Sequence, residues 1–139
     1  DIGISLELRY EDVPTWLKRV YHRYDFQMNV NYFYQLPDPV LGVHRHYGTD
    51  QIRKGTHFVN SSRYSNPTLD GLLDSGAGEP DAAKRTAAYK EIQQILANDM
   101  PVVNLFELEF LVVYNNKLKG AYGSAMGAYG SFREAYLDD

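Results

Sequence analysis

The chain has 139 residues, a length typical of one domain, of which 44% are hydrophobic and 23% are charged. This composition excludes a disordered polyelectrolyte and a membrane-embedded chain. With 14 basic and 18 acidic residues the net charge is -4, so nucleic acid is not expected as a partner, because the attraction to phosphate is missing. The absence of cysteine removes disulfides, thiolate metal sites and cysteine nucleophiles.

The first part of the chain carries a strand, helix, strand pattern. Residues 4–8 alternate apolar and polar side chains, which is the period of a half-buried strand. Pro14 suits a first helical turn, and apolar positions from Trp16 to Tyr21 recur at spacings of three and four. Period two returns over residues 26–34. This pattern predicts a βαβ unit with parallel strands.

The middle of the chain predicts a loop followed by two helices. Residues 35–65 predict loop with helical turns, including a short helix near positions 40 to 47. Asn66 and Pro67 offer a cap and a first-turn proline for a short helix, and Asp81 caps a longer helix that ends at Pro101. The apolar stripe of the longer helix consists of Ala88, Ile92, Ile95 and Leu96.

Two further strands and a tail follow. Residues 102–106 and 110–114 are rich in β-branched and aromatic side chains, and they predict two largely buried strands. The sequence Gly-Ala-Tyr-Gly-Ser occurs at 120–124 and again at 127–131. Two copies are too few for a repeat fold, so they predict a glycine-rich connection that carries aromatic side chains.

Five short motifs follow one another along the chain. They are Asp38-Pro39, the Tyr-x-Asn-Pro-x-x-Asp-x-Leu-Leu segment 64–73, Asp81 with Arg85, the Pro-Val-x-x-Leu-Phe segment 101–106, and the Asn-x-x-x-x-Gly segment 115–120. In this order they resemble the C-terminal region of the peptide-type, or family 5, extracellular solute-binding proteins of ABC transporters. Asp81 and Arg85 also have the spacing of a favourable i,i+4 pair on a helix.

The resemblance implies an α/β fold in which this chain is part of one lobe of a two-lobed periplasmic-binding-protein-like structure. It places residues 1–119 in the C-terminal lobe and makes the Gly- and Tyr-rich tail 120–139 the return toward a missing N-terminal lobe. It also implies capture of a peptide-like or other small solute for an ABC transporter permease, at a periplasmic or extracellular membrane-associated location. Residues 1–4 look like the interior of a domain, so we expect a piece of a longer protein.

The same resemblance places four candidate ligand contacts in one stretch of chain. Tyr32 falls where peptide-binding relatives can carry a tryptophan, and Tyr32 and Tyr34 either stack on ligand or pack beneath a helix. Gln35 falls where those relatives place an aspartate for the ligand's amino group, and a neutral amide cannot form that charge-assisted bond. A solute without a free amine therefore fits the predicted site as well as a peptide does. Asp38 either reaches ligand or caps the following turn.

Catalytic and metal motifs are missing from the sequence. It contains no Gly-x-Ser-x-Gly elbow, P-loop or His-Glu-x-x-His segment. His44 and His46 share a face only on a strand and have no third ligand nearby in sequence, so we predict no metal and no cofactor. Two alternatives stay open: an enzyme whose catalytic residues lie in a missing N-terminal part, and a ligand-sensing regulatory domain of the same fold.

Overall fold

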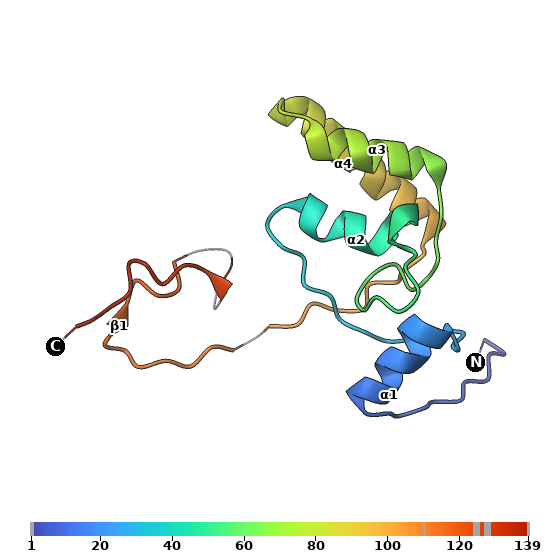
Figure 1. Cartoon of the computed structure of the whole chain (residues 1–139), viewed down its shortest axis with the longest axis horizontal. Helices are drawn as coiled ribbons and strands as arrows, with labels where there is room; N and C mark the ends of the chain where they lie inside the picture. Colours follow the sequence, from blue (N-terminus) through green and yellow to red (C-terminus); the bar gives the residue numbers. More distant parts are fainter. Residues whose placement is uncertain (1, 110, 124–125, 127–128, 139) are drawn as a thin grey trace.

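Helices dominate the computed structural model, which describes residues 2–109, 111–123, 126 and 129–138. The helices gather into one body, and the chain beyond α4 leaves it as an arm that carries the C terminus (Figure 1). In chain order the helical elements are α1 (Val13–Leu17), the π-helical η1 (Lys18–Arg23), the 3-10 turn η2 (Pro39–Leu41), α2 (Val43–Tyr47), the 3-10 turn η3 (Thr49–Gln51), α3 (Pro67–Gly78) and α4 (Ala82–Asp99). The strands are β1 (Leu118–Lys119) and β2 (Tyr136–Leu137), which pair antiparallel with Leu118 opposite Leu137.

The starts of α3 and α4 confirm the two predicted caps. The side chain of Asn66 accepts hydrogen bonds from the backbone N–H groups of Thr68 and Leu69, at 3.0 and 3.2 Å. Asp81 accepts from the N–H groups of Ala83 and Lys84, both at 2.9 Å. Each cap satisfies donors that the first helical turn leaves without a partner, which is why these short sequence signals fix the helix starts.

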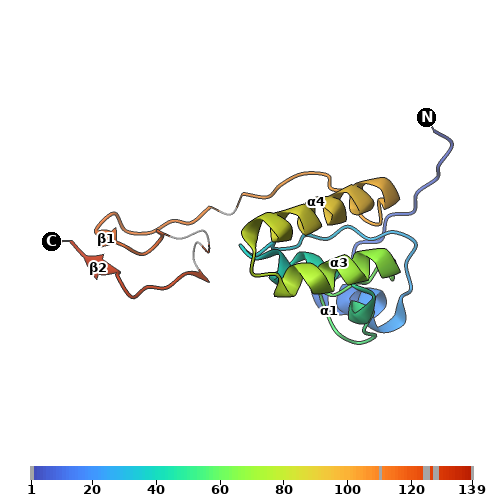
Figure 2. The same ribbon diagram turned by 90° about the horizontal axis from the view of Figure 1, so that it is seen from above.

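The two long helices lie side by side and enclose an apolar core (Figure 2). Leu69, Leu73 and Ile92 are fully buried between them, and α2 packs against the same core. Gly76 lies inside α3, two residues before the helix ends at Gly78. A Cβ at that position would lie 3.3 Å from the ring of Tyr89 on α4, so the glycine permits the close approach of the two helices.

A second core forms around α1 and η1. Val20, Tyr21 and Val59 are buried there, and the ring of Trp16 meets that of Tyr21 edge-on, with centroids 5.7 Å apart. The helix predicted from Pro14 onward is thereby confirmed, although its second half is π-helical. The predicted turns within residues 35–65 are confirmed by η2, α2 and η3.

The predicted βαβ unit is wrong for this structure. Residues 4–8, 26–34 and 102–106 form no strand, and neither do residues 111–114; residue 110 lies outside the described residues. Most of their apolar side chains are exposed instead, with 77% of Val30 and 95% of Val113 accessible, while Phe26 and Phe33 are partly buried. Alternating hydrophobicity shows that a face favours burial, but a strand also needs a hydrogen-bonding neighbour, and these segments do not pair with one another. The fold is mixed and helix-rich, with one small sheet, and is compatible with the α/β class in that coarser sense.

The tail folds back on the chain that precedes it. The strand β2 pairs with β1, and the backbone N–H of Asp138 donates to the carbonyl of Lys117 at 2.8 Å. Parts of the predicted repeat, at positions 124, 125, 127 and 128, lie outside the described residues. Across the described part of the chain, no helix combines the length and the apolar character that a membrane span needs.

Candidate functional site

Two of the four candidate residues lie in an exposed aromatic cluster. Tyr32 and Tyr34 follow η1 on irregular chain, 57% and 41% exposed, with ring centroids 6.1 Å apart in an edge-to-face arrangement. Tyr129 comes back from the tail and meets Tyr34 in the same manner, at 6.0 Å. We call Tyr32, Tyr34 and Tyr129 the tyrosine cluster. Of the two interpretations left open by the sequence, packing beneath a helix does not fit the exposure of these rings.

The phenol of Tyr34 is held in its neutral form. Partial loss of hydration raises the pKa of Tyr34, and the neighbouring Tyr129 raises it further through its charge and a hydrogen bond. A neutral phenol donates as well as accepts hydrogen bonds. The cluster therefore offers aromatic faces together with hydroxyl groups, a combination suited to stacking on a ligand and orienting it.

Gln35 lies between the tyrosine cluster and α2. Its amide oxygen packs so closely on Gly42 that a Cβ there would lie 2.1 Å from it, and its amide nitrogen lies 3.3 Å from Nδ1 of His46. In this arrangement the amide donates to Nδ1, so the proton of the neutral imidazole resides on Nε2. Gln35 thus has a structural contact that its sequence position did not predict.

His46 is a buried, neutral histidine. Only 5% of the residue is exposed, and its ring lies against that of Phe33 with centroids 3.8 Å apart. Burial lowers the pKa of His46 to about 4, and the charge of Arg45 adds to the shift. Its Nε2 atom is buried without a hydrogen-bond partner. The extended chain and α2 are therefore joined by a contact that depends on an uncharged imidazole.

Asp38 acts as a cap and an ion-pair partner. Its Oδ1 atom accepts from the backbone N–H of Val40 at 2.9 Å and from Arg85 at 2.7 Å. Arg85 also donates to the carbonyl of Gly76 at 3.0 Å, and its side chain lowers the pKa of Asp38. The sequence spacing paired Arg85 with Asp81, whereas the structure pairs it with Asp38. This ion pair ties η2 to α4 and so positions the turn that follows the tyrosine cluster.

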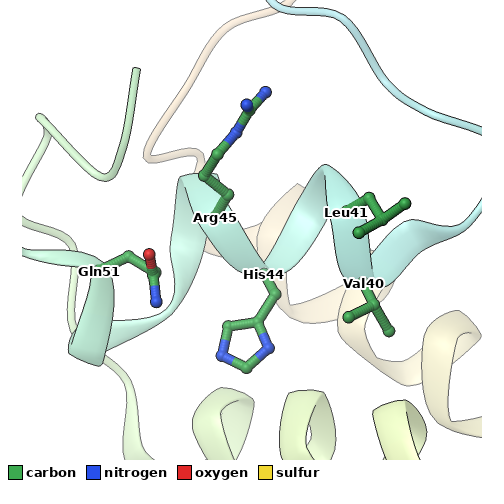
Figure 3. A pocket seen from close by; sticks show the side chains of 5 residues that line it. All are labelled: Val40, Leu41, His44, Arg45 and Gln51. Atoms are coloured by element: carbon green, nitrogen blue, oxygen red, sulfur yellow. The ribbon is translucent and has the colours of Figure 1, made fainter. Parts of the chain in front are cut away.

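Two pockets of the structure are lined by none of the four candidate residues. One, of about 290 Å³, is shallow and is lined by Val40, Leu41, His44, Arg45 and Gln51 (Figure 3). In Figure 3 the side chains of His44 and Arg45 project from opposite sides of α2. A second pocket, of about 520 Å³, surrounds β1 and includes the rings of Tyr114 and Tyr122.

The described side chains include no group of three or more histidine, aspartate or glutamate residues arranged to hold a metal ion. His44 pairs with Asp50 at 3.3 Å, while His46, two residues further along α2, is buried. The two histidines singled out in the sequence therefore serve different contacts. Sequence reasoning does not identify Tyr129 or His46 as site residues, although the repeat around Tyr129 predicts a glycine-rich connection that carries aromatic side chains.

The chain is distantly similar in sequence to a protein described as a periplasmic binding protein. The chain is 29% identical over 120 residues, or 86% of its length, to an Escherichia coli strain K12 protein described as the probable D,D-dipeptide-binding periplasmic protein DdpA. It is 36% identical over 66 residues to Protein XP55 of Streptomyces lividans. These matches cover 22% and 12% of the two relatives, so the chain spans only a small part of their length. No family model and no solved structure matches the chain.

Proposed function

We propose that the protein containing this chain captures a small solute, peptide-like or otherwise, and delivers it to a permease of an ABC transporter. The proposal is carried by the similarity to the Escherichia coli periplasmic protein, which extends over 86% of the chain. That relative is described as a binding protein, which favours ligand capture over the enzyme alternative. The proposed location is periplasmic, or extracellular and membrane-associated.

In this proposal the tyrosine cluster and Gln35 face the ligand. The exposure of Tyr32 and Tyr34 supports this role, because exposed rings remain available for stacking. Gln35 supplies an amide and no charge, so we expect no strong preference for a free amino group. Asp38, whose Oδ1 takes both of its hydrogen bonds, can contact ligand only through Oδ2.

The remainder of the protein is the proposed partner of the exposed apolar segments. Residues 102–109 and 111–114 expose Val103, Leu105 and Leu111 to 68%, 67% and 90%. Contiguous exposed apolar surface marks a site of contact with another structure. We propose that these segments pack within the rest of the lobe formed by residues 1–119, and that the tail 120–139 continues toward the other lobe.

Calorimetry on the intact protein tests the ligand class. We expect a D,D-dipeptide and its N-acetylated form to bind with similar affinity, since residue 35 carries no charge. Gln35→Asp should then improve binding of the free amine by about tenfold or more, because a charge-assisted hydrogen bond contributes about 1.5–3 kcal/mol. Gln27→Asp, an exposed position in the preceding segment, controls for the added negative charge.

Two results would count against this assignment. Strong preference of the unchanged protein for the free amine would show that another acidic group binds it. Equal affinities for both ligands in Gln35→Asp would show that residue 35 does not face the amine. Mass spectrometry of molecules that co-purify with the intact protein identifies the ligand independently, and turnover of such a molecule would support the enzyme alternative.

A further inference from the structure

Two histidines from distant parts of the sequence face each other at the surface. His22 lies in the last turn of η1, and His57 lies in the loop that follows η3. Their Nε2 atoms are 3.0 Å apart, and their ring centroids are 5.2 Å apart. Both residues are exposed. Because 35 residues separate them, no sequence spacing indicates the pair.

The backbone beneath the pair is fixed by the α1–η1 core. Gly55, in a left-handed conformation with φ of 89°, donates its N–H to the carbonyl of Tyr21 at 2.8 Å. Tyr21 is fully buried, and its ring also lies 5.9 Å from that of His57. Val59, two residues after His57, is buried in the same core. The loop is thus anchored on both sides of His57, so the backbone keeps the two imidazoles within reach of each other.

Two Nε2 atoms this close can serve as a pair of metal ligands when both imidazoles carry their proton on Nδ1 and turn their Nε2 lone pairs toward one ion. At the usual metal–nitrogen distance of about 2.0–2.1 Å, a separation of 3.0 Å corresponds to an angle of roughly 91–97° at the metal. That angle fits neighbouring positions of a square-planar or octahedral ion better than the wider angle of tetrahedral zinc. Among divalent ions, Cu²⁺ and Ni²⁺ combine this geometry with strong affinity for imidazole.

We propose that His22 and His57 form a surface site for a divalent transition metal, with Cu²⁺ and Ni²⁺ preferred over Zn²⁺. The metal replaces the hydrogen bond between the two imidazoles and joins η1 to the loop before Val59. Its remaining positions are open to water or to a small ligand. Cu²⁺ is the first choice of the two, because it has the highest affinity for nitrogen ligands among these divalent ions.

Metal titration of the intact, untagged protein tests the site. We expect one equivalent of Cu²⁺ to bind, with an electron paramagnetic resonance spectrum showing two equatorial imidazole nitrogens. His22→Ala and His57→Ala should each weaken binding by at least about tenfold, as expected when half of the ligand set is lost. His44→Ala is the matched control, because His44 is paired with Asp50 and lies on α2.

A measurement on the unchanged protein tests the site without relying on the folding of the variants. Paramagnetic Ni²⁺ or Cu²⁺ should broaden the imidazole NMR signals of His22 and His57 before those of His44 and His46. Equal broadening of all four histidines, or affinity unchanged in both His22→Ala and His57→Ala, would overturn the proposal. Tighter binding of Zn²⁺ than of Cu²⁺ would overturn the assigned preference.

Discussion

The hairpin formed by α3 and α4 buries its large apolar side chains, whereas the C-terminal arm leaves the same kind of side chain exposed. In α3 and α4 the side chains of Leu73 and Ile92 are 0% and 1% exposed, whereas Leu111 and Val113 in the arm are 90% and 95% exposed. A helix completes its backbone hydrogen bonds within its own segment, so two helices can bury each other. A strand depends on a neighbouring strand, and the described residues of the arm form none before β1. Apolar sequence alone therefore does not determine burial.

The largest effect is expected where the hairpin buries most. Ile92→Ala should lower the free energy of unfolding by about 2–5 kcal/mol, because it removes apolar contacts and leaves a cavity facing Leu69 and Leu73. Ile95 is only partly buried, so Ile95→Ala should cost less. Urea denaturation of the three proteins checks this order. An unchanged midpoint for Ile92→Ala would mean that the hairpin core is not formed in solution.

A second prediction concerns the contact between the helical body and the exposed chain. The folded-state pKa of His46 is about 4, below its ordinary value of 6.5, so the unfolded chain binds more protons between these values. Stability should therefore be complete above about pH 6.5 and fall as the pH drops toward about 4, by at most about 3 kcal/mol.

His46→Phe separates this histidine from other titrating groups. The variant keeps an aromatic ring against Phe33 and should lose most of the pH dependence in that window. Asp38 and Asp99 have lowered pKa values, so their contributions are lost only at more acidic pH. Denaturation midpoints between pH 4 and pH 7 provide the comparison. The same slope in both proteins would show that His46 is not buried as a neutral group.

A smaller effect is expected at the link between η2 and α4. Asp38→Ala removes a cap and an ion pair, each partly exposed, and should lower the denaturation midpoint by less than Ile92→Ala does. Arg85→Met removes the ion pair together with the hydrogen bond to the carbonyl of Gly76, and the double variant gives the coupling energy between Asp38 and Arg85. We expect the two single effects to add to more than the double effect, because both remove the same bond. Strict additivity would contradict the pairing of Asp38 with Arg85.

The features that the sequence could predict are those determined within a few residues. Asn66 and Asp81 cap helices through side chains that reach only the next turn, so local sequence identified both. The pairing of Asp38 with Arg85 joins residues that are 47 positions apart, and helix spacing favoured a closer partner.

The candidate site shows the same limit. Tyr32, Tyr34 and Gln35 are candidates because they precede a recognisable motif, whereas Tyr129 and His46 contact them through the tertiary fold. The segments predicted as strands have an alternating or apolar pattern, but they pair with no strand among the described residues. Sequence reasoning therefore nominates residues on one segment and does not indicate those that the fold brings to it.

The smallest effect on the stability of this chain is expected at an exposed position of the arm. Val113→Thr replaces a methyl group with a hydroxyl at a position that is 95% exposed in this chain. Because water already surrounds the side chain, the free energy of unfolding of the 139-residue chain should change by no more than about 0.5 kcal/mol. In the intact protein, where we propose that the arm is covered, the same substitution buries a hydroxyl and should cost about 1–3 kcal/mol. Parallel denaturation of both proteins measures the difference. Equal small effects would show that the arm stays exposed in the intact protein, and the proposed packing of residues 111–114 within the lobe would be withdrawn.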